Sequence, residues 1–263
     1  MPYGFGPVTG PRRGPDGDGF ECKDTPRSTT LSVSYETDAA QLAAILPECF
    51  ELGAEPIVTV SVTDMRDLEW LAGRGYSMLG VSFPAVYRGT EETVRGPFLS
   101  VLWENMADPI LTGREELGFA KLFCNLPEAE ISARSASCSA DWDGFKFMSM
   151  QLQELEQQEV TDVAGIRPFD GVLHYKYIPK TGEWGDADVA YPVISPAEMP
   201  NRKIVEHWTG IGEVKWFEAR WEDMPTQYNI VNRLAGLEVV RSVGAALTKT
   251  TGGKDLRDQR RLR

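Results

Sequence analysis

Alternating hydrophobic and polar residues run through most of the chain and predict a structure made mainly of β-strands. These runs are rich in β-branched and aromatic residues and are bounded by glycine, proline and aspartate, which is typical of half-buried strands. Nine segments show the pattern: 30–35, 55–65, 76–87, 97–104, 129–137, 144–155, 171–179, 186–194 and 212–221. The sequence contains neither an internal repeat nor a linker long enough to require two domains.

Helical spacing of apolar residues is confined to the segments 37–48, 108–118 and 225–240. In the first, Thr37 or Asp38 is placed to cap the helix, which ends ahead of Pro47. The third presents on one face the apolar residues Ile230, Val231, Leu234 and Leu237. Few helices beside nine strands favour an α+β, mainly β domain, either closed into a barrel or folded as a sandwich.

The two ends of the chain differ from this pattern. Residues 1–28 are rich in glycine and proline and lack the apolar stretch of a signal peptide, so we expect a flexible N-terminal arm. Residues 29–250 form the domain. Residues 251–263 are dominated by charge and predict a solvated C-terminal tail.

Net charge and length narrow the classes of function. The 263 residues suffice for a substantial core, and the net charge of −12 argues against a nucleic-acid partner or an anionic membrane surface. No apolar run approaches the roughly 20 residues that span a bilayer. The four cysteines form no CxxC pair, which favours reduced thiols. We therefore expect a cytoplasmic protein that acts on small molecules.

Metal and serine-triad chemistry are disfavoured by the residues present. The chain has only two histidines, His174 and His207, whereas catalytic zinc sites usually use two or three at helical spacing. No GxSxG stretch is present. We expect neither a metal nor a cofactor, so the chemistry has to come from lysine, carboxylates or shape.

Lys121 lies inside the apolar run of "GREELGFAKLF" (113–123), which is an unusual place for a lysine. One interpretation is a lysine whose stem packs on Phe119 and Phe123 while its ammonium reaches water. The other is a Schiff-base lysine, whose pKa is lowered by desolvation so that the neutral amine can attack a ketone. The iminium formed would stabilise a carbanion on the adjacent carbon.

Four blocks in order resemble segments of the acetoacetate decarboxylase family. The block "GREELGFAKL" is similar to the family's active-site motif, roughly G-R-E-x-x-G-[FY]-P-K-[KLI], and keeps its lysine as Lys121. The other three are "YETDAAQLAAILPECFEL" (35–52), "VEHWTGIGEV" (205–214) and "EDMPTQYNIV" (222–231). The resemblance implies a closed, cone-like antiparallel β-barrel with a few flanking helices and an apolar cavity, in a homo-oligomer, with Lys121 as the Schiff-base lysine.

Several positions depart from the family pattern. Leu122 stands where the prototype has a second lysine, and Ala120 replaces the proline before the nucleophile. The prototype's first glutamate falls near Ser61, its second near Arg74 or Met78, and its substrate-binding arginine close to Ser28, one position from Arg27. A keto acid needs a carboxylate anchor and a proton donor, so these changes put acetoacetate itself in doubt as the substrate.

Glu104, which ends a strand before the helix that leads to Lys121, is the best remaining acid, with a surface carboxylate as the equal alternative. The candidates for substrate binding are Arg27, Arg74, Tyr76, Met78, Trp103, Arg114, Glu115, Phe119 and Leu122. Among them Arg114 and Glu115 also suit a structural role, and Tyr76 and Trp103 also suit the core. His174 is predicted to be a surface or interface histidine, because it points away from Leu173 and Tyr175 on its strand.

The sequence therefore predicts a lysine-dependent lyase that acts on a hydrophobic keto acid or a polyketide-like carbonyl compound. An imine-driven or shape-driven aldolase, dehydratase or cyclase of secondary metabolism is nearly as well supported. A non-catalytic barrel that binds an apolar ligand is the third hypothesis, since the lysine is kept while its partners have changed.

Overall fold

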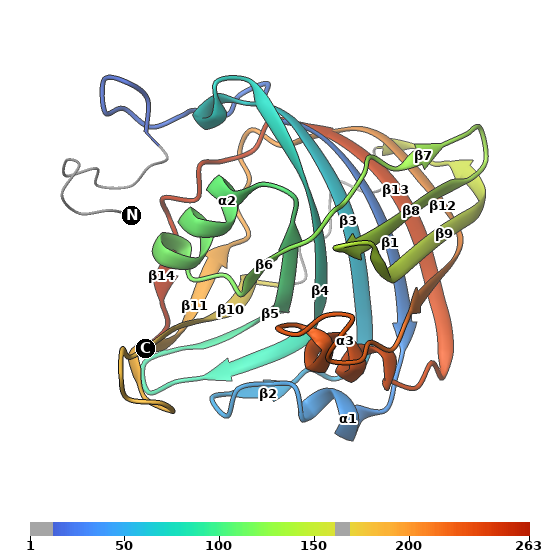
Figure 1. Cartoon of the computed structure of the whole chain (residues 1–263). Coiled ribbons are helices and arrows are strands. Elements are labelled where there is room, and N and C mark those ends of the chain that lie inside the picture. Colours follow the sequence, from blue (N-terminus) through green and yellow to red (C-terminus); the bar gives the residue numbers. More distant parts are fainter. Residues whose placement is uncertain (1–12, 161–168) are drawn as a thin grey trace.

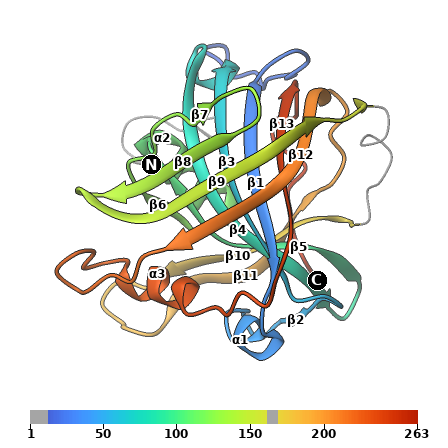
Figure 2. The same cartoon turned by 90° about the vertical axis from the view of Figure 1, so that its right-hand side faces the viewer.

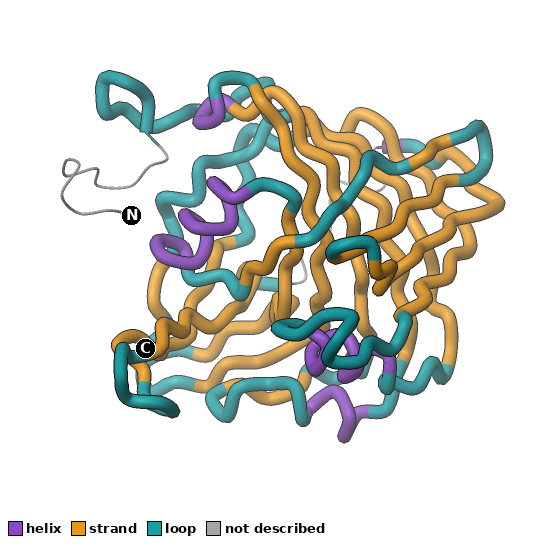
Figure 3. The backbone as a smooth tube through the Cα atoms, viewed as in Figure 1, coloured by secondary structure: helices purple, strands orange, loops and turns teal. Residues whose placement is uncertain are grey.

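The computed structural model describes residues 13–160 and 169–263. One large twisted sheet dominates it, with short helices at its margins (Figures 1 and 3). The first strands are β1 (Arg27–Glu36), β2 (Phe50–Leu52), β3 (Ile57–Leu68), β4 (Arg74–Arg88), β5 (Thr93–Glu104), β6 (Lys121–Phe123) and β7 (Glu130–Ile131). The others are β8 (Ala136–Trp142), β9 (Phe145–Gln157), β10 (Gly171–Pro179), β11 (Ala187–Pro196), β12 (Lys203–Trp216), β13 (Arg241–Thr251) and β14 (Arg260–Arg261).

The helices are few and short. The α-helices are α1 (Ala39–Ala43), α2 (Ala107–Thr112) and α3 (Tyr228–Ala235). A 3-10 turn, η2, covers Glu69–Leu71, and a π-helical turn, η3 (Gly113–Leu117), continues α2. In the described part of the chain no helix is long and apolar enough to cross a membrane.

The strands pair in the order β14-β11-β10-β5-β4-β3-β1-β13-β12-β9-β8-β7, with β2 added to β4 and β6 added to β5. Nearly all pairs are antiparallel; β10 and β6 each run parallel to β5. The sheet curves strongly (Figure 2). Within residues 13–160 and 169–263, however, no pairing joins β14 to β7. The expected mainly β fold with few helices is confirmed, and closure of the barrel is not.

One face of the sheet, which we call the core face, carries the hydrophobic core. Alternate residues of β1, β3 and β4 are buried there, as the period of two along a strand requires. Trp103 of β5 is fully buried at its centre, with Phe147 and Trp216 at ring-centroid distances of 5.2 and 6.0 Å. The indole nitrogen of Trp103 donates a 2.6 Å hydrogen bond to Oε1 of Gln227, which satisfies a polar group that burial would otherwise leave unpaired.

The helices lie at the three predicted segments, but α1 and α3, with 5 and 8 residues, are shorter than predicted. Asp38 caps α1 and accepts a hydrogen bond from the backbone N–H of Gln41. Pro109 lies in the first turn of α2, and the helical segment ends at Gly118 in the left-handed conformation. Val231 and Leu234 of α3 are buried in the core, as their spacing predicts.

All nine predicted strand segments contain strands, with two differences. The segment 129–137 is split by a turn into β7 and the start of β8, and the ninth segment belongs to a longer strand, β12, that begins at Lys203. Strand β13 was not predicted, although it lies between β1 and β12 in the sheet. Its sequence, "RSVGAALTKTT", is rich in small residues and lacks a strong alternation.

The predicted N-terminal arm and C-terminal tail differ in part from the structure. Of the arm predicted over 1–28, residues 1–12 lie outside the described residues, and β1 already begins at Arg27. At the other end, the prediction of a solvated tail is wrong. Leu262 is 2% exposed and joins the core, and β14 pairs with β11. A leucine between arginines gives too short an apolar signal to reveal this contact.

We predict that the core around Trp103 carries much of the stability. Trp103→Ala should lower the free energy of unfolding by about 3–5 kcal/mol, because it leaves a cavity and removes the partner of Gln227. Urea denaturation followed by circular dichroism measures this loss. Trp184→Ala is the matched control, because Trp184 is 95% exposed and its replacement should change stability by less than about 0.5 kcal/mol. Equal losses in the two variants would contradict this placement of the core.

Candidate active site

Lys121 is the first residue of β6, and the short segment between β5 and β6 determines its position. The chain leaves β5, forms α2 and η3, turns at Gly118, and returns to pair in parallel with β5 (Figure 1). Gly118 has φ +82°, a conformation that glycine adopts without strain. The backbone N–H of Phe119 donates to the carbonyl of Gly113 at 3.0 Å, which closes the turn.

The Lys121 ammonium is buried and is held by close contacts. Its Nζ lies 2.7 Å from Oε1 of Glu104 and donates a 2.9 Å hydrogen bond to the carbonyl of Pro109. It also lies 5.7 Å from the centroid of the Phe119 ring. The Lys121 side chain is 6% exposed and that of Glu104 is 0% exposed. These partners favour the charged amine, whereas burial favours the neutral amine.

Gly113 makes room for this lysine. A Cβ atom at position 113 would lie 2.4–2.5 Å from Cε, Cδ and Nζ of Lys121. Such distances are too short for non-bonded atoms, so any larger residue would displace the lysine from Glu104. The glycine that opens the sequence motif therefore has a steric role in the site.

Strand register places Lys121 in a row of residues that crosses the sheet. Lys121 pairs with Leu102, Leu102 with Gly80, Gly80 with Ser61, and Ser61 with Ser32. Directly paired residues project to the same side, so this row defines a second face, which we call the lysine face. Glu104 lies two residues beyond Leu102 on β5 and therefore shares it.

Small hydroxyl side chains dominate the lysine face beyond Gly80. The hydroxyls of Thr30 and Thr63 are hydrogen-bonded at 2.9 Å, and those of Ser34 and Thr59 at 2.8 Å. Ser61, where the family resemblance would place a glutamate, lies in the same row as Lys121. The carboxylate of Glu104 directly contacts the lysine.

Three further candidate residues lie on different faces of the sheet. Met78 pairs with Glu104 in the register and lies on the lysine face. Trp103 lies on the opposite face, inside the core. Leu122 also packs against the core, because it follows Lys121 on a strand and so points to the other side.

The remaining candidates lie around or away from Lys121. Arg114 is exposed, and its Nη1 donates to the backbone carbonyl of Lys121 at 2.9 Å; the carbonyl of Glu115 accepts from Lys176 at 2.6 Å. Tyr76 is half-buried on β4 opposite Met65. Arg27 and Arg74 are exposed near strand ends, where Arg27 pairs with Asp67 and Arg74 donates to the carbonyl of Leu71. The structure does not bring these two arginines to Lys121.

His174 is a neighbour of the site that the sequence analysis placed wrongly. It points away from Leu173 as expected, but it is fully buried rather than on the surface. Its ring stacks on Phe119 at a centroid distance of 4.1 Å, and its Nδ1 lies 3.2 Å from the carbonyl of Gly118. Desolvation lowers the pKa of His174 to about 4. Alternation along β10 could not reveal that another segment covers its outer face.

Two hollows lie elsewhere on the molecule. One, of about 400 Å³, is lined by residues of α3, by the two residues that follow it and by Gln41. The other, of about 370 Å³, lies where strands β1, β3 and β13 end, and Arg27 and Lys249 contribute to it. Neither is lined by Lys121 or Glu104. The apolar cavity around the lysine therefore remains a prediction.

Comparison with known proteins bears directly on this arrangement. The family model of acetoacetate decarboxylase (ADC) matches residues 1–252. The chain belongs to the acetoacetate decarboxylase family. Over 213 residues, which are 75% of this chain and 77% of the relative, it is 24% identical to an acetoacetate decarboxylase of Clostridium botulinum (strain Eklund 17B / Type B). Membership in the acetoacetate decarboxylase family makes the chain an enzyme of the decarboxylase-like class and leaves its own reaction open.

Solved structures agree on the fold of this acetoacetate decarboxylase family member. A structure of acetoacetate decarboxylase superposes with a TM-score of 0.68 at 17% identity, covering 90% of this chain and 89% of the other. The enduracididine biosynthesis enzyme MppR, complexed with the condensation product of pyruvate and imidazole 4-carboxaldehyde, gives a TM-score of 0.60 at 15% identity, covering 94% of this chain and 93% of MppR. At these identities the likeness concerns the fold.

We predict that His174 makes the stability of this family member depend on pH. The unfolded chain binds a proton at His174 near pH 6.5, whereas the folded chain binds it only near pH 4. Between these values the unfolded state binds more protons, so stability falls as the pH falls. The contribution of His174 to this fall should approach about 3 kcal/mol by pH 4. Urea denaturation at several pH values measures it.

The comparison that isolates His174 uses two variants. His174→Phe keeps an aromatic ring against Phe119 and should flatten the dependence between pH 7 and pH 4. His207→Phe should leave most of it in place, since His207 is only half-buried. Parallel stability curves for wild type and His174→Phe would contradict the assignment.

Proposed function

We propose that the protein is a lysine-dependent lyase in which Lys121 forms a Schiff base with a hydrophobic keto acid or polyketide-like carbonyl substrate. The observation that carries this proposal is the buried contact of 2.7 Å between Lys121 and Glu104, within the matched motif. A buried amine in contact with a carboxylate can exchange its proton over one hydrogen bond, which is what an amine nucleophile requires.

Glu104 has the position to act as acid and base in this reaction. It accepts a proton from the Lys121 ammonium, and the neutral amine then attacks the carbonyl carbon of the substrate. The carbinolamine takes up a proton and loses water, which leaves an iminium. Glu104 is the group in contact with Nζ that can supply and recover these protons.

Decarboxylation of the iminium then follows. The bond between the carboxylate carbon and its neighbour breaks, CO₂ leaves, and the electron pair moves into the iminium to give an enamine. Glu104, which gave its proton to the carbinolamine, takes up a proton from water and passes it to the enamine carbon, which restores an iminium. Addition of water releases the ketone and returns Lys121 as an amine.

The neighbours of Lys121 favour an apolar substrate. Phe119, Leu102 and Met78 surround or pair with the catalytic groups, and the hydroxyl side chains begin only beyond Gly80. The row from Lys121 to Ser32 contains no second cation to hold a substrate carboxylate. The apolar character of these neighbours favours a hydrophobic carbonyl compound over acetoacetate.

An aldol, dehydration or cyclisation reaction through the same iminium is the second candidate. It is favoured by the same lack of a carboxylate anchor in the row of Lys121, and by the fold shared with MppR, which was solved with a condensation product of pyruvate and an aldehyde. Both candidates use Lys121 as the nucleophile. They differ in whether CO₂ is released.

Homo-oligomerisation, expected from the family resemblance, also remains a prediction. Light scattering coupled to size-exclusion chromatography measures the oligomeric state directly.

We predict that borohydride traps the imine on Lys121. The protein is incubated with a panel of keto acids, diketones and aldehydes together with borohydride, and peptide mass spectrometry locates the adduct. Because reduction makes the carbon–nitrogen bond permanent, each fitting carbonyl compound should add its mass, less one oxygen, to the peptide that contains Lys121. Parallel detection of CO₂ identifies decarboxylation.

Three variants control this trapping experiment. Lys121→Arg keeps a positive charge beside Glu104 and should abolish the adduct. Because removing one partner of a buried ion pair costs about 3–5 kcal/mol, the neutral control replaces both partners, as Lys121→Met with Glu104→Gln. Lys146→Ala, at an exposed position, should retain full trapping. A folded wild type that traps no carbonyl compound would instead support an apolar-ligand binder.

We predict that Glu104→Gln lowers the maximal rate of imine formation by about 10²–10⁴-fold, the usual contribution of a positioned acid or base. The amide keeps the size of the carboxylate but cannot take a proton from Lys121. Stopped-flow trapping at saturating carbonyl compound measures the rate, and Glu115→Gln, at an exposed site in the same motif, is the matched control. A rate within threefold of wild type would exclude Glu104 as the proton carrier.

A further inference from the structure

The segment Lys254–Arg263 is held against the body of the protein by several contacts. Arg260 makes two contacts of 2.6 Å with the carboxylate of Glu92, and this pairing lowers the pKa of Glu92. The backbone N–H of Leu262 donates to the carbonyl of Pro192 at 3.0 Å. Lys254 donates to the carbonyl of Pro196 at 2.5 Å. The segment is therefore fixed on both sides of Gln259.

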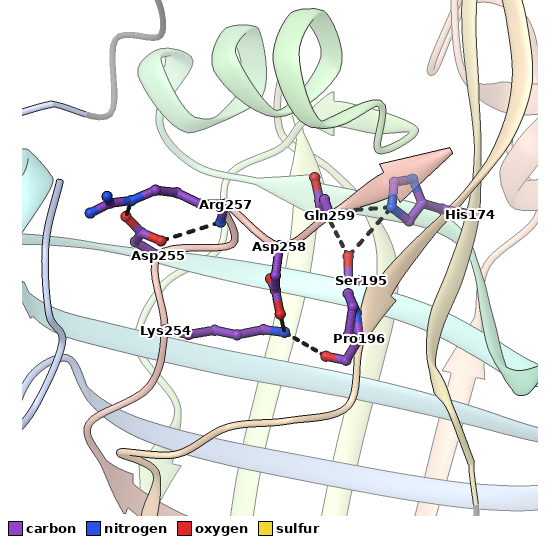
Figure 4. Close-up of polar contacts among 8 residues, drawn as sticks. All are labelled: His174, Ser195, Pro196, Lys254, Asp255, Arg257, Asp258 and Gln259. Atoms are coloured by element: carbon purple, nitrogen blue, oxygen red, sulfur yellow. Dashed lines mark hydrogen bonds and ion pairs between the residues drawn. The ribbon is translucent and has the colours of Figure 1, made fainter. Parts of the chain in front are cut away.

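Gln259 begins a chain of hydrogen bonds that passes through Ser195 and His174 (Figure 4). From His174 the chain continues to Gly118 in the lysine motif. Its side-chain amide donates to the hydroxyl of Ser195 at 2.6 Å, and the same nitrogen lies 3.5 Å from Nε2 of His174. The hydroxyl of Ser195 also lies 3.5 Å from Nε2 of His174. On the other side of the ring, Nδ1 lies 3.2 Å from the carbonyl of Gly118.

The direction of these hydrogen bonds follows from the groups involved. A carbonyl only accepts, so Nδ1 of His174 must carry the proton. Burial keeps the imidazole neutral, so Nε2 is an acceptor and takes its hydrogen bond from the donors at Ser195 and Gln259. Each group in the chain therefore donates to the next: Gln259 to Ser195, Ser195 to His174, and His174 to the carbonyl of Gly118. A group that cannot donate at position 259 would break this order.

We propose that Gln259 is a positioning residue of the active site, which acts through Ser195 and His174 to fix Gly118 and Phe119 and thereby places Lys121 against Glu104. His174 contacts this turn twice, by the hydrogen bond to Gly118 and by the ring stack on Phe119. Only Ala120 separates Phe119 from Lys121. The effect of this placement on catalysis rests on the proposed function, whereas the contacts from Gln259 to the turn at Gly118 do not.

The short turn explains how contacts so far along the chain reach the nucleophile. Gly118 has no Cβ and occupies a left-handed conformation, so its own backbone preferences restrict the turn little. The stacked ring and the hydrogen bond from His174 supply restraint that the glycine lacks. An error of about 1 Å in the position of a reacting group can cost about 10²-fold in rate, so this restraint affects catalysis directly.

The test compares three variants with wild type in the full-length protein. Gln259→Leu removes the donor, and Gln259→Glu keeps the shape but offers an acceptor that draws the Ser195 hydroxyl away from His174. Arg257→Ala is the matched control, because Arg257 lies in the same segment, is largely exposed and pairs with Asp255. Two readouts do not depend on imine chemistry: the His174 tautomer, seen by long-range ¹H–¹⁵N NMR, and amide hydrogen exchange of the peptide 113–123.

We expect wild type and Arg257→Ala to show the Nδ1–H tautomer and a protected peptide. Both Gln259 variants should alter the Nε2 resonance and speed exchange of this peptide at least tenfold. In borohydride trapping, they should lower the maximal rate about tenfold or more while changing the half-saturating carbonyl concentration less than twofold. A merely structural role would lower the melting temperature and leave these kinetic constants unchanged.

Two results would overturn the positioning role. One is an unchanged tautomer and exchange rate in both Gln259 variants. The other is trapping in wild type whose maximal rate does not depend on Gln259. If wild type traps no imine, the proposed function falls, while the tautomer and exchange readouts still decide whether Gln259 positions the turn.

Discussion

The buried ion pair between Lys121 and Glu104 is the constraint on which the rest of the site depends. Two charges removed from water are costly unless each is held by close partners, and removing one partner destabilises strongly. The pair is held from both sides: Glu104 by the end of β5, and Lys121 by α2, η3 and the space at Gly113. The same contacts that make the pair tolerable in the interior also define the geometry in which a proton can pass between its members.

The residues that stabilise the fold and the residues of the candidate site lie on opposite faces of the sheet. Apolar residues of β1, β3, β4 and β5 fill the core face, while the lysine face carries the ion pair and several hydrogen-bonded serine and threonine side chains. Neighbours in sequence therefore have unrelated roles: Trp103 and Leu122 belong to the core, and Glu104 and Lys121 to the site. A lysine at position 122 would point into the core in this fold, so a leucine there follows from the local packing.

The features that depend on a few neighbouring residues could be predicted from the sequence. The strand segments, the cap at Asp38 and the lysine motif were all visible, because alternation and capping act over a few residues. Contacts between distant segments were not. His174 was predicted to be exposed because alternation identifies the side of a strand but not what covers it, and here Gln259 and Phe119 do so. Strand β13 was missed because pairing on both sides, rather than its own residues, makes it a strand.

The resting ion pair has a consequence for reactivity. As long as Glu104 is charged, it favours the protonated amine, which cannot attack a carbonyl. In the proposed reaction the first step therefore moves a proton from Lys121 to Glu104. An apolar substrate that excludes water beside the pair would make that transfer easier, because it raises the free energy of the two charged groups but not of the two neutral groups. In the same proposal, Glu104 would then serve the later proton transfers. In the proposed reaction, selectivity for apolar carbonyl compounds and activation of the lysine would therefore have the same physical origin.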